Sequence, residues 1–175
     1  MAEEESGNNP NPEAKPGNQP AAGGTEPQFR IHKVFLKDVS FESPQTPAVF
    51  VASNNWKPQV SLQINTESLQ LENDLLETVL TVNVTVKSDD KSVYLVEVKQ
   101  AGLFLLKDFP EGDKQRMLGT FCPNILFPFA REEIAALVAK GGFPQLLLDP
   151  VNFDALYAQH LAQARQNAPA PETPQ

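Results

Sequence analysis

Apolar and polar side chains alternate along residues 76–86, which carry the sequence LETVLTVNVTV. Leu, Val and Thr occupy the even-numbered positions, and Glu77, Thr81, Asn83 and Thr85 lie between them. A period of two is typical of a β-strand, because successive side chains point to opposite faces of a sheet. We therefore predict a strand here with one buried face.

A polar turn and a second apolar run follow this strand. Ser88-Asp89-Asp90-Lys91 has the length and composition of a hairpin turn. It leads into residues 93–106, VYLVEVKQAGLFLL, where only Glu97, Lys99 and Gln100 interrupt apolar side chains on both faces. A strand that is apolar on both sides must be covered twice, or its exposed face must be used. This run is a first indication of oligomerisation or ligand binding.

Two further strands are predicted nearer the N-terminus. Residues 29–42 alternate imperfectly, with lysines on the apolar side, so that neither face is purely buried or exposed. Pro44 and Pro47 end this strand, because proline cannot donate to a β-ladder. The alternation over residues 56–65 is cleaner. Short connections between four such strands predict an antiparallel meander.

The spacing of apolar residues becomes helical after the fourth strand. Pro123 suits an early helical position and Gly141-Gly142 a helix stop, while Pro128 should kink or divide the segment between them. Asp149-Pro150 is expected to cap a second helix. The apolar stripe of that helix comprises Phe153, Leu156, Tyr157, His160, Leu161 and Ala164. The fold class is therefore α+β, although two helices are too few to cover four long strands on both faces.

Proline-rich tails flank the predicted domain. Residues 1–27 contain no Val, Ile, Leu or aromatic side chain, so we expect them to be disordered and not a signal peptide. Residues 166–175 form a second, shorter flexible tail, which leaves residues 28–165 as the folded domain. The net charge is −8, of which only −3 falls within that domain. A sequence pI near 4.7 argues against a nucleic-acid partner.

Few residues are available for catalysis or metal binding. One cysteine and two isolated histidines cannot form a zinc site of known spacing, and no phosphate-binding loop occurs. Because no run of about 18 apolar residues exists, no membrane helix is expected. Cys122 precedes a predicted helix and is the candidate nucleophile. Neither His32 nor His160 has the surroundings of a catalytic base, so a packing role is favoured and no enzyme, cofactor or metal is predicted.

The sequence is rich in phenylalanine, with 11 residues of this type. Four of them, at positions 121, 127, 129 and 143, surround the first predicted helix. They could supply a core together with a subunit interface. They could equally line an apolar groove that accepts an extended polypeptide. The pattern alone leaves both interpretations open.

Four motifs resemble the SecB protein-export chaperone family. They are Phe41-Glu42-Ser43-Pro44, the run CPNILFPFARE at residues 122–132, GFPQL at residues 142–146 and PVNFDALY at residues 150–157. The similarity runs in order from about Phe29 to Leu161 and excludes both tails. The second motif is long and chemically unusual, so chance is a poor explanation for it.

This resemblance implies a homotetramer, built as a dimer of dimers, whose subunits each carry a four-stranded antiparallel sheet with two main helices on one side. A partner subunit would bury what two helices leave uncovered. The implied activity is that of an ATP-independent cytoplasmic chaperone. It holds unfolded precursor proteins in a translocation-competent state and delivers them to the SecA translocation ATPase. A general holdase, or an antitoxin-associated chaperone of the same fold, is the alternative.

The resemblance also implies sites. SecA contacts correspond to Asp38 and Glu42 of the first strand and to Leu95 and Glu97 of the fourth; within each strand these residues share a face. Four aromatic residues are candidates for the client groove: Trp56, Phe104, Phe127 and Phe143. Three positions are associated with tetramer assembly: Val96, Val98 and Gln100. The short, proline-rich C-terminal tail departs from the family, which puts a second contact with the SecA terminus in doubt.

Overall fold

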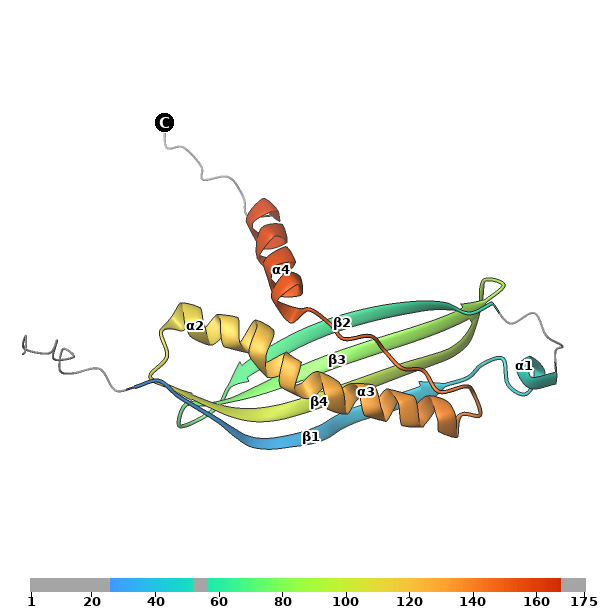
Figure 1. Ribbon diagram of the computed structural model, residues 1–175, viewed down its shortest axis with the longest axis horizontal. Helices are drawn as coiled ribbons and strands as arrows, with labels where there is room; N and C mark the ends of the chain where they lie inside the picture. Colours follow the sequence, from blue (N-terminus) through green and yellow to red (C-terminus); the bar gives the residue numbers. More distant parts are fainter. Residues whose placement is uncertain (1–25, 52–56, 168–175) are drawn as a thin grey trace, which may run out of the picture.

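The computed structural model describes residues 26–51 and 57–167, and it contains one antiparallel sheet with helices on one face (Figure 1). The predicted tails lie largely outside these ranges, and so does Trp56. The strands are β1 (Gln28–Glu42), β2 (Gln59–Gln70), β3 (Leu75–Ser88) and β4 (Lys91–Lys107). The helical segments are α1 (Ala48–Val51), α2 (Glu111–Arg116), η1 (Met117–Phe121), α3 (Cys122–Lys140) and α4 (Phe153–Asn167).

The strand order is β1-β4-β3-β2, so the predicted meander is only partly correct. The strands β2, β3 and β4 follow one another through tight turns, and Asp89 and Asp90 have the positive φ angles of a two-residue hairpin turn. Strand β1 instead pairs with β4, and the chain then crosses to the opposite edge of the sheet to begin β2. The connection that makes this crossing contains α1.

Strand β1 contains two register irregularities that explain its imperfect alternation. The pairing with β4 shifts between Ile31 and Lys33 and again between Leu36 and Asp38. Each extra residue reverses which face the following side chains occupy. The side chains of β1 that pack against the core are therefore those of Phe29, Val34 and Phe41, which do not share one parity.

The two faces of the sheet differ in what covers them. Even-numbered side chains are buried from Leu76 to Val86 in β3 and from Tyr94 to Leu106 in β4, and most of them form one core with residues of α3. The inward side of α3 recurs every four residues, at Cys122, Leu126, Ala130, Ile134 and Val138. Most odd-numbered side chains of β3 and β4 are only half-buried, and they form the open face of the sheet, opposite α3 (Figure 1).

The first long helical segment begins earlier than predicted and is not divided. The helical run begins at Glu111 and passes through the π-helical turn η1 into α3. Sequence did not predict this early beginning, because Gly112 and Asp113 have low helix propensity. Pro128 lies inside α3 without ending it. Proline has no N–H, so the carbonyl of Asn124 receives no hydrogen bond from residue 128. Asn124 and Pro128 are both exposed, so water can donate to that carbonyl instead.

The C-terminus of α3 is closed by a Schellman motif. Gly142 has a φ of 85°, which a residue with a side chain rarely adopts. The Gly142 amide donates to the Ala139 carbonyl, and the Phe143 amide donates to the Val138 carbonyl over 3.2 Å. This geometry directs the chain back across the sheet and begins the interhelical segment, residues 143–152.

The cap of helix α4 lies three residues later than predicted. The Ala155 amide donates to Asn152 Oδ1 over 3.0 Å, so Asn152, and not Asp149, caps the helix. Only its first turns contact the rest of the chain, because Phe153 is buried, Tyr157 is half-buried and Leu161 is exposed. The remainder of α4 projects away from the sheet and includes the first residues of the predicted C-terminal tail (Figure 1).

Candidate functional site

The predicted partner-binding residues lie together on the open face of the sheet. The register opposes Asp38 to Lys99 and Glu42 to Leu95 across the β1–β4 pair, and Glu97 lies between these positions. The second bulge of β1 precedes Asp38, so Asp38 and Glu42 do occupy one face, as their spacing predicts. The structure therefore groups the four side chains at one end of the β1–β4 pair.

Two ion-pair groups cross this open face. Lys99 Nζ lies 3.2 Å from Asp38 Oδ2 and 3.1 Å from Glu97 Oε1. Hydrogen bonds with Glu97 and then Asp38 raise the pKa of Lys99 above its ordinary value. Separately, Lys37 Nζ approaches Glu77 Oε1 to 2.7 Å. The face is thus charged but partly self-neutralised.

An aromatic cluster lies on the opposite, helix-covered face. Phe143 contacts Tyr94 at a ring-centroid distance of 4.8 Å and Phe50 of α1 at 5.0 Å. Phe41 stacks on Tyr94 at 6.0 Å. Burial raises the pKa of Tyr94, which keeps its hydroxyl protonated. The cluster joins α1, β1, β4 and the interhelical segment at one end of the sheet.

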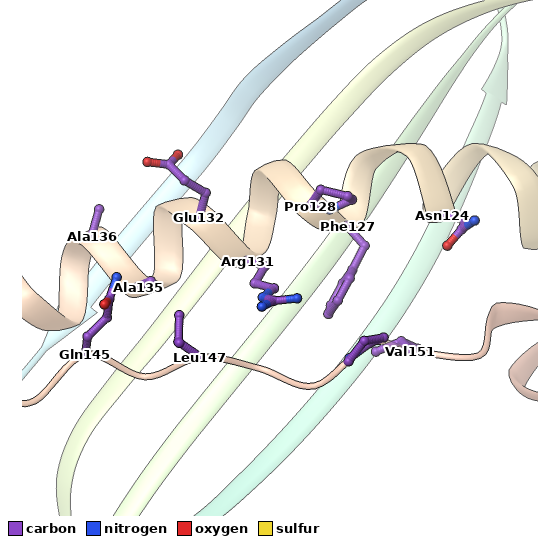
Figure 2. Close-up of a pocket in the computed structure, with 11 residues that line it drawn as sticks. Asn124, Phe127, Pro128, Arg131, Glu132, Ala135, Ala136, Gln145, Leu147 and Val151 are labelled. Atoms are coloured by element: carbon purple, nitrogen blue, oxygen red, sulfur yellow. The ribbon is translucent and has the colours of Figure 1, made fainter.

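Two apolar cavities flank the interhelical segment. One, of about 440 Å³, lies between α3 and this segment, and its lining includes Phe127, Leu147 and Val151 (Figure 2). In the close-up Phe127 points from α3 towards the segment, Leu147 points back towards α3, and Glu132 points away. The other cavity, of about 150 Å³, is lined in part by Val60, Tyr94 and Phe143. Gln145 lines both, so the two cavities adjoin on either side of the segment.

A third cavity, of about 280 Å³, lies where α4 meets β2 and η1. Its lining includes Ile64, Leu118, Phe153 and Tyr157. All three cavities therefore occur on the helix-covered side and border β2 or the interhelical segment. The side chains of Val60 and Leu62 on β2 are also exposed there.

The aromatic residues predicted for a client groove occupy different environments. Phe104 is 0% exposed, packs on Phe29 at 5.9 Å and belongs to the core of this chain. Phe127 and Phe143 are 5% and 6% exposed, yet each lines a cavity. Trp56 lies outside the described residues.

The three positions associated with assembly all lie in the core. Val96, Val98 and Gln100 are even-numbered residues of β4, with exposures of 2%, 0% and 5%. Their side chains face α3 within this chain.

Cys122 has the environment of a packing residue. Its side chain is buried, and burial raises the pKa of the thiol to about 12, against the opposing effect of a hydrogen bond with Thr78. A thiol with that pKa supplies almost no thiolate at neutral pH. Among the described residues, no group of three or more His, Cys, Asp or Glu side chains could hold a metal ion. None of the described helices is long and apolar enough to cross a membrane.

Several residues of these surfaces were not predicted. Leu147 is 62% exposed beside the largest of these cavities, and Lys99 was noted only as an interruption of an apolar strand. A signal for the first was present in Leu146-Leu147-Leu148, an apolar run without strand or helix periodicity between a helix stop and a cap. No signal identified Lys99, because its partners depend on the β1–β4 register.

Fold and site together define an α+β protein with apolar cavities on the helix-covered face of its sheet and a charged open face. The family model described as preprotein translocase subunit SecB matches residues 22–164. This chain therefore belongs to the SecB family.

Relatives named protein-export protein SecB cover most of the chain. One from Pseudomonas savastanoi pv. phaseolicola is 51% identical over 148 residues, which cover 85% of this chain and 88% of the relative. One from Nitrosococcus oceani is 49% identical over 154 residues, covering 88% of this chain and 93% of the relative.

A solved structure shares the fold. It is the SecB-like chaperone of Mycobacterium tuberculosis in complex with a ChAD peptide from an antitoxin, with a TM-score of 0.60 and 15% sequence identity. The similarity covers 71% of this chain and 91% of that one. The resemblance to the SecB family inferred from the four motifs is thus confirmed, and so is the four-stranded antiparallel sheet with helices.

Proposed function

We propose that this chain is an ATP-independent, non-enzymatic chaperone of the cytoplasm that keeps unfolded precursor proteins competent for translocation and delivers them to the SecA ATPase. The observation that carries this proposal is the SecB family match over residues 22–164, together with relatives of about 50% identity named for protein export. A chaperone that binds only the unfolded state lowers the concentration of free unfolded chains by mass action, and this needs no nucleotide.

The client site in this proposal lies along the interhelical segment. Two adjoining apolar cavities, on either side of Gln145, can accept side chains of an extended polypeptide. Alternate side chains of an extended chain point in opposite directions, so one segment can reach both cavities. The cavity beside Leu147 combines apolar side chains with Asn124, Arg131, Glu132 and Gln145, and the cavity beside Val60 is lined mostly by apolar side chains. Apolar contacts of this kind do not require one particular client sequence.

A single substitution tests this client site. Leu147→Glu places a charge beside the largest of these cavities, at a side chain that is 62% exposed and contributes little to the fold. We expect at least a fivefold weaker affinity for an unfolded precursor, measured by fluorescence anisotropy, because burying the charge against apolar client side chains is costly.

Leu69→Glu is the matched control for this substitution. Leu69 is 60% exposed but belongs to the open face and lines none of the described cavities. The affinity of the Leu69→Glu variant for the unfolded precursor should stay close to that of the unmodified protein. Equal losses in both variants would place the client elsewhere.

The proposed SecA contact is the open face around Asp38, Glu42, Leu95 and Glu97. Three carboxylates around one half-buried leucine match the arrangement that a basic partner surface recognises, since charge sets orientation and association rate while the apolar group adds contact area. Asp38 and Glu97 are side by side through their shared ion pair with Lys99.

The proposed assembly is a homotetramer formed as a dimer of dimers. Support comes from the outward side of the long helix, where Phe121 and Phe129 are 44% and 50% exposed. Aromatic side chains of this exposure are typical of protein interfaces. In this proposal Val96, Val98 and Gln100 influence assembly indirectly, because they set the position of α3 from beneath.

Charge reversal separates export from general holding. The triple variant Asp38→Lys, Glu42→Lys and Glu97→Lys changes only the open face, away from the cavities. We expect it to delay the refolding of a precursor as well as the unmodified protein does, but to lose detectable binding to SecA. Retained SecA binding would favour the alternative, a general or antitoxin-associated holdase that does not use this face for export.

A further inference from the structure

The positive charge of Lys99 is placed between two of the three carboxylates proposed to bind SecA. Its Nζ atom lies within 3.2 Å of both Asp38 and Glu97. Asp38 is directly opposite Lys99 in the β1–β4 register, and Glu97 is two residues away on the same strand face. The lysine is held by a hydrogen bond to Asp38 and by an ion pair with Glu97 rather than extended freely into solvent.

Glu42 has a different environment on the same face. Among the described residues it takes part in no ion pair, and its register partner is Leu95. A basic partner can therefore approach Glu42 directly. To reach Asp38 or Glu97 it must compete with a lysine of the same chain.

We propose that Lys99 lowers the affinity of the open face for a basic partner, because it occupies Asp38 and Glu97 and so weakens their attraction for that partner. This inference rests on the proposed SecA contact and adds its regulation. An intramolecular lysine competes at every partner concentration, so the affinity is lower than three free carboxylates would give.

The magnitude follows from the exposure of these groups. Side chains of Lys99 and Glu97 are 37% and 35% exposed, and that of Asp38 is 59% exposed. Exposed ion pairs contribute modestly, so removing the competitor should tighten binding by about three- to tenfold. The gain should shrink when salt shortens the range of the charges.

The test is Lys99→Gln, measured by isothermal calorimetry with purified SecA at low and at high ionic strength. We expect about three- to tenfold tighter binding at low salt and a steeper salt dependence than in the unmodified protein. Lys99→Arg retains the charge and should restore the original affinity. Client holding, measured by precursor refolding, should be the same in all three proteins.

Lys37→Gln is the matched control, because it removes one positive charge from the same face. Lys37 pairs with Glu77, which is not among the proposed contacts. Its effect on SecA affinity should be less than half that of Lys99→Gln on a logarithmic scale. If the two variants changed the affinity equally, the loss of one positive charge would explain the result wherever that charge lies, and the inference would be overturned.

Failure of the inference and failure of the proposed function give different results. If the unmodified protein binds SecA and the Lys99→Gln variant binds it equally well or more weakly, then Lys99 does not weaken the interaction, although the proposed SecA contact is still supported. If no variant binds SecA, the proposed function fails, and an oligolysine peptide then serves as the basic probe. If the Lys99→Gln variant binds this peptide more tightly than the Lys37→Gln variant does, the proposed role of Lys99 is supported. Equal binding by the two variants overturns it.

Discussion

The thiol of Cys122 shows how burial can turn a candidate nucleophile into a structural residue. It lies inside a continuous helical run that begins at Glu111, so the helix N-terminus, where the dipole would favour a thiolate, is elsewhere, and only the hydrogen bond with Thr78 favours the charged form. Desolvation prevails, because the side chain has no exposed surface and belongs to the core beneath α3. The hydroxyl of Thr78, which also contacts Ser68 Oγ at 3.1 Å, supplies its polar contact.

The raised pKa of Cys122 has a consequence for stability at alkaline pH. The folded-state pKa, about 12, lies above the ordinary value of 9.0, so the protonated thiol contributes stability that is complete below pH 9 and lost between these values. The free energy of unfolding should therefore fall in this window by up to about 1.4 kcal/mol per pH unit.

Cys122→Ala isolates this contribution, because the variant keeps every other titrating group. Its stability deficit relative to the unmodified protein, measured by urea unfolding, should shrink as the pH rises above about 9. A deficit that stays constant up to pH 11 would contradict the assignment. Cys122→Ser should leave the chaperone activity unchanged, whereas a thiol enzyme would lose its activity.

At the scale of elements, the attachment of α4 depends on one glycine. A Cβ atom built on Gly119 of η1 would collide with the ring of Tyr157 in the first half of α4. The π-helical turn presents this glycine to α4, and Thr120 Oγ1 donates to the Arg116 carbonyl within it. The close approach lets α4 rest on η1 with few other contacts.

Gly119→Ala should therefore release α4. We expect a loss of about 1–3 kcal/mol, since the ring must move away from a backbone that cannot yield. Limited proteolysis with trypsin, followed at Arg165, should be faster in this variant. Gly112→Ala is the control, because that glycine has nothing within 4 Å and the variant should be slightly stabilised.

A double-mutant cycle completes this test. In a Tyr157→Ala background the added methyl group meets no ring, so Gly119→Ala should become neutral or slightly stabilising. Additive losses from the two substitutions would show that the glycine is required for another reason.

The elements differ in how well sequence predicted them. The strand β3 follows a period of two, and β4 is a long apolar run that follows a polar turn, so both were found within a few residues. The two bulges of β1 hide the same period, because each reverses the face of the next side chain. Helix α2 is short and polar, and Gly112 lowers its propensity. The pairing of β1 with β4 is set by tertiary packing, which no local pattern records.

The candidate site was predictable where it follows local geometry. Asp38 and Glu42 share a face because their spacing is even and no bulge separates them. The burial of Phe104 was not predictable, since residue type does not distinguish an aromatic side chain that lines a groove from one in the core. The cavities beside the interhelical segment depend on Leu147 and on the Schellman motif that turns the chain there.

At the scale of the whole molecule, the chain presents two different surfaces, which the proposed function assigns to different tasks. The cavities occur on the helix-covered side, and the charged residues lie on the open face. The single sheet separates the cavities from the charged residues, so a client and a basic partner need not compete for the same side chains. The exposed aromatics of η1 and α3 belong to the helix-covered side.

The proposed assembly gives the clearest whole-molecule test. Native mass spectrometry of the full chain should show a tetramer, and Phe129→Glu should shift it towards dimers or monomers by at least tenfold in dissociation constant, because a charge cannot be buried in an apolar contact. Leu69→Glu, of similar exposure on the open face, should leave the mass unchanged. A stable monomer of the unmodified chain would contradict the proposal.

The strand order also has a consequence during synthesis. Strand β1 leaves the ribosome first but pairs with β4, whose last residue is made 65 positions after Glu42. At ordinary translation rates this delay is roughly 3 to 13 s. The hairpins β2–β3 and β3–β4 can close as they emerge, whereas the apolar side chains of β1 wait without a partner. In each nascent chain, β1 is therefore an unpaired, unfolded segment for several seconds, and such segments are what the finished protein is proposed to protect.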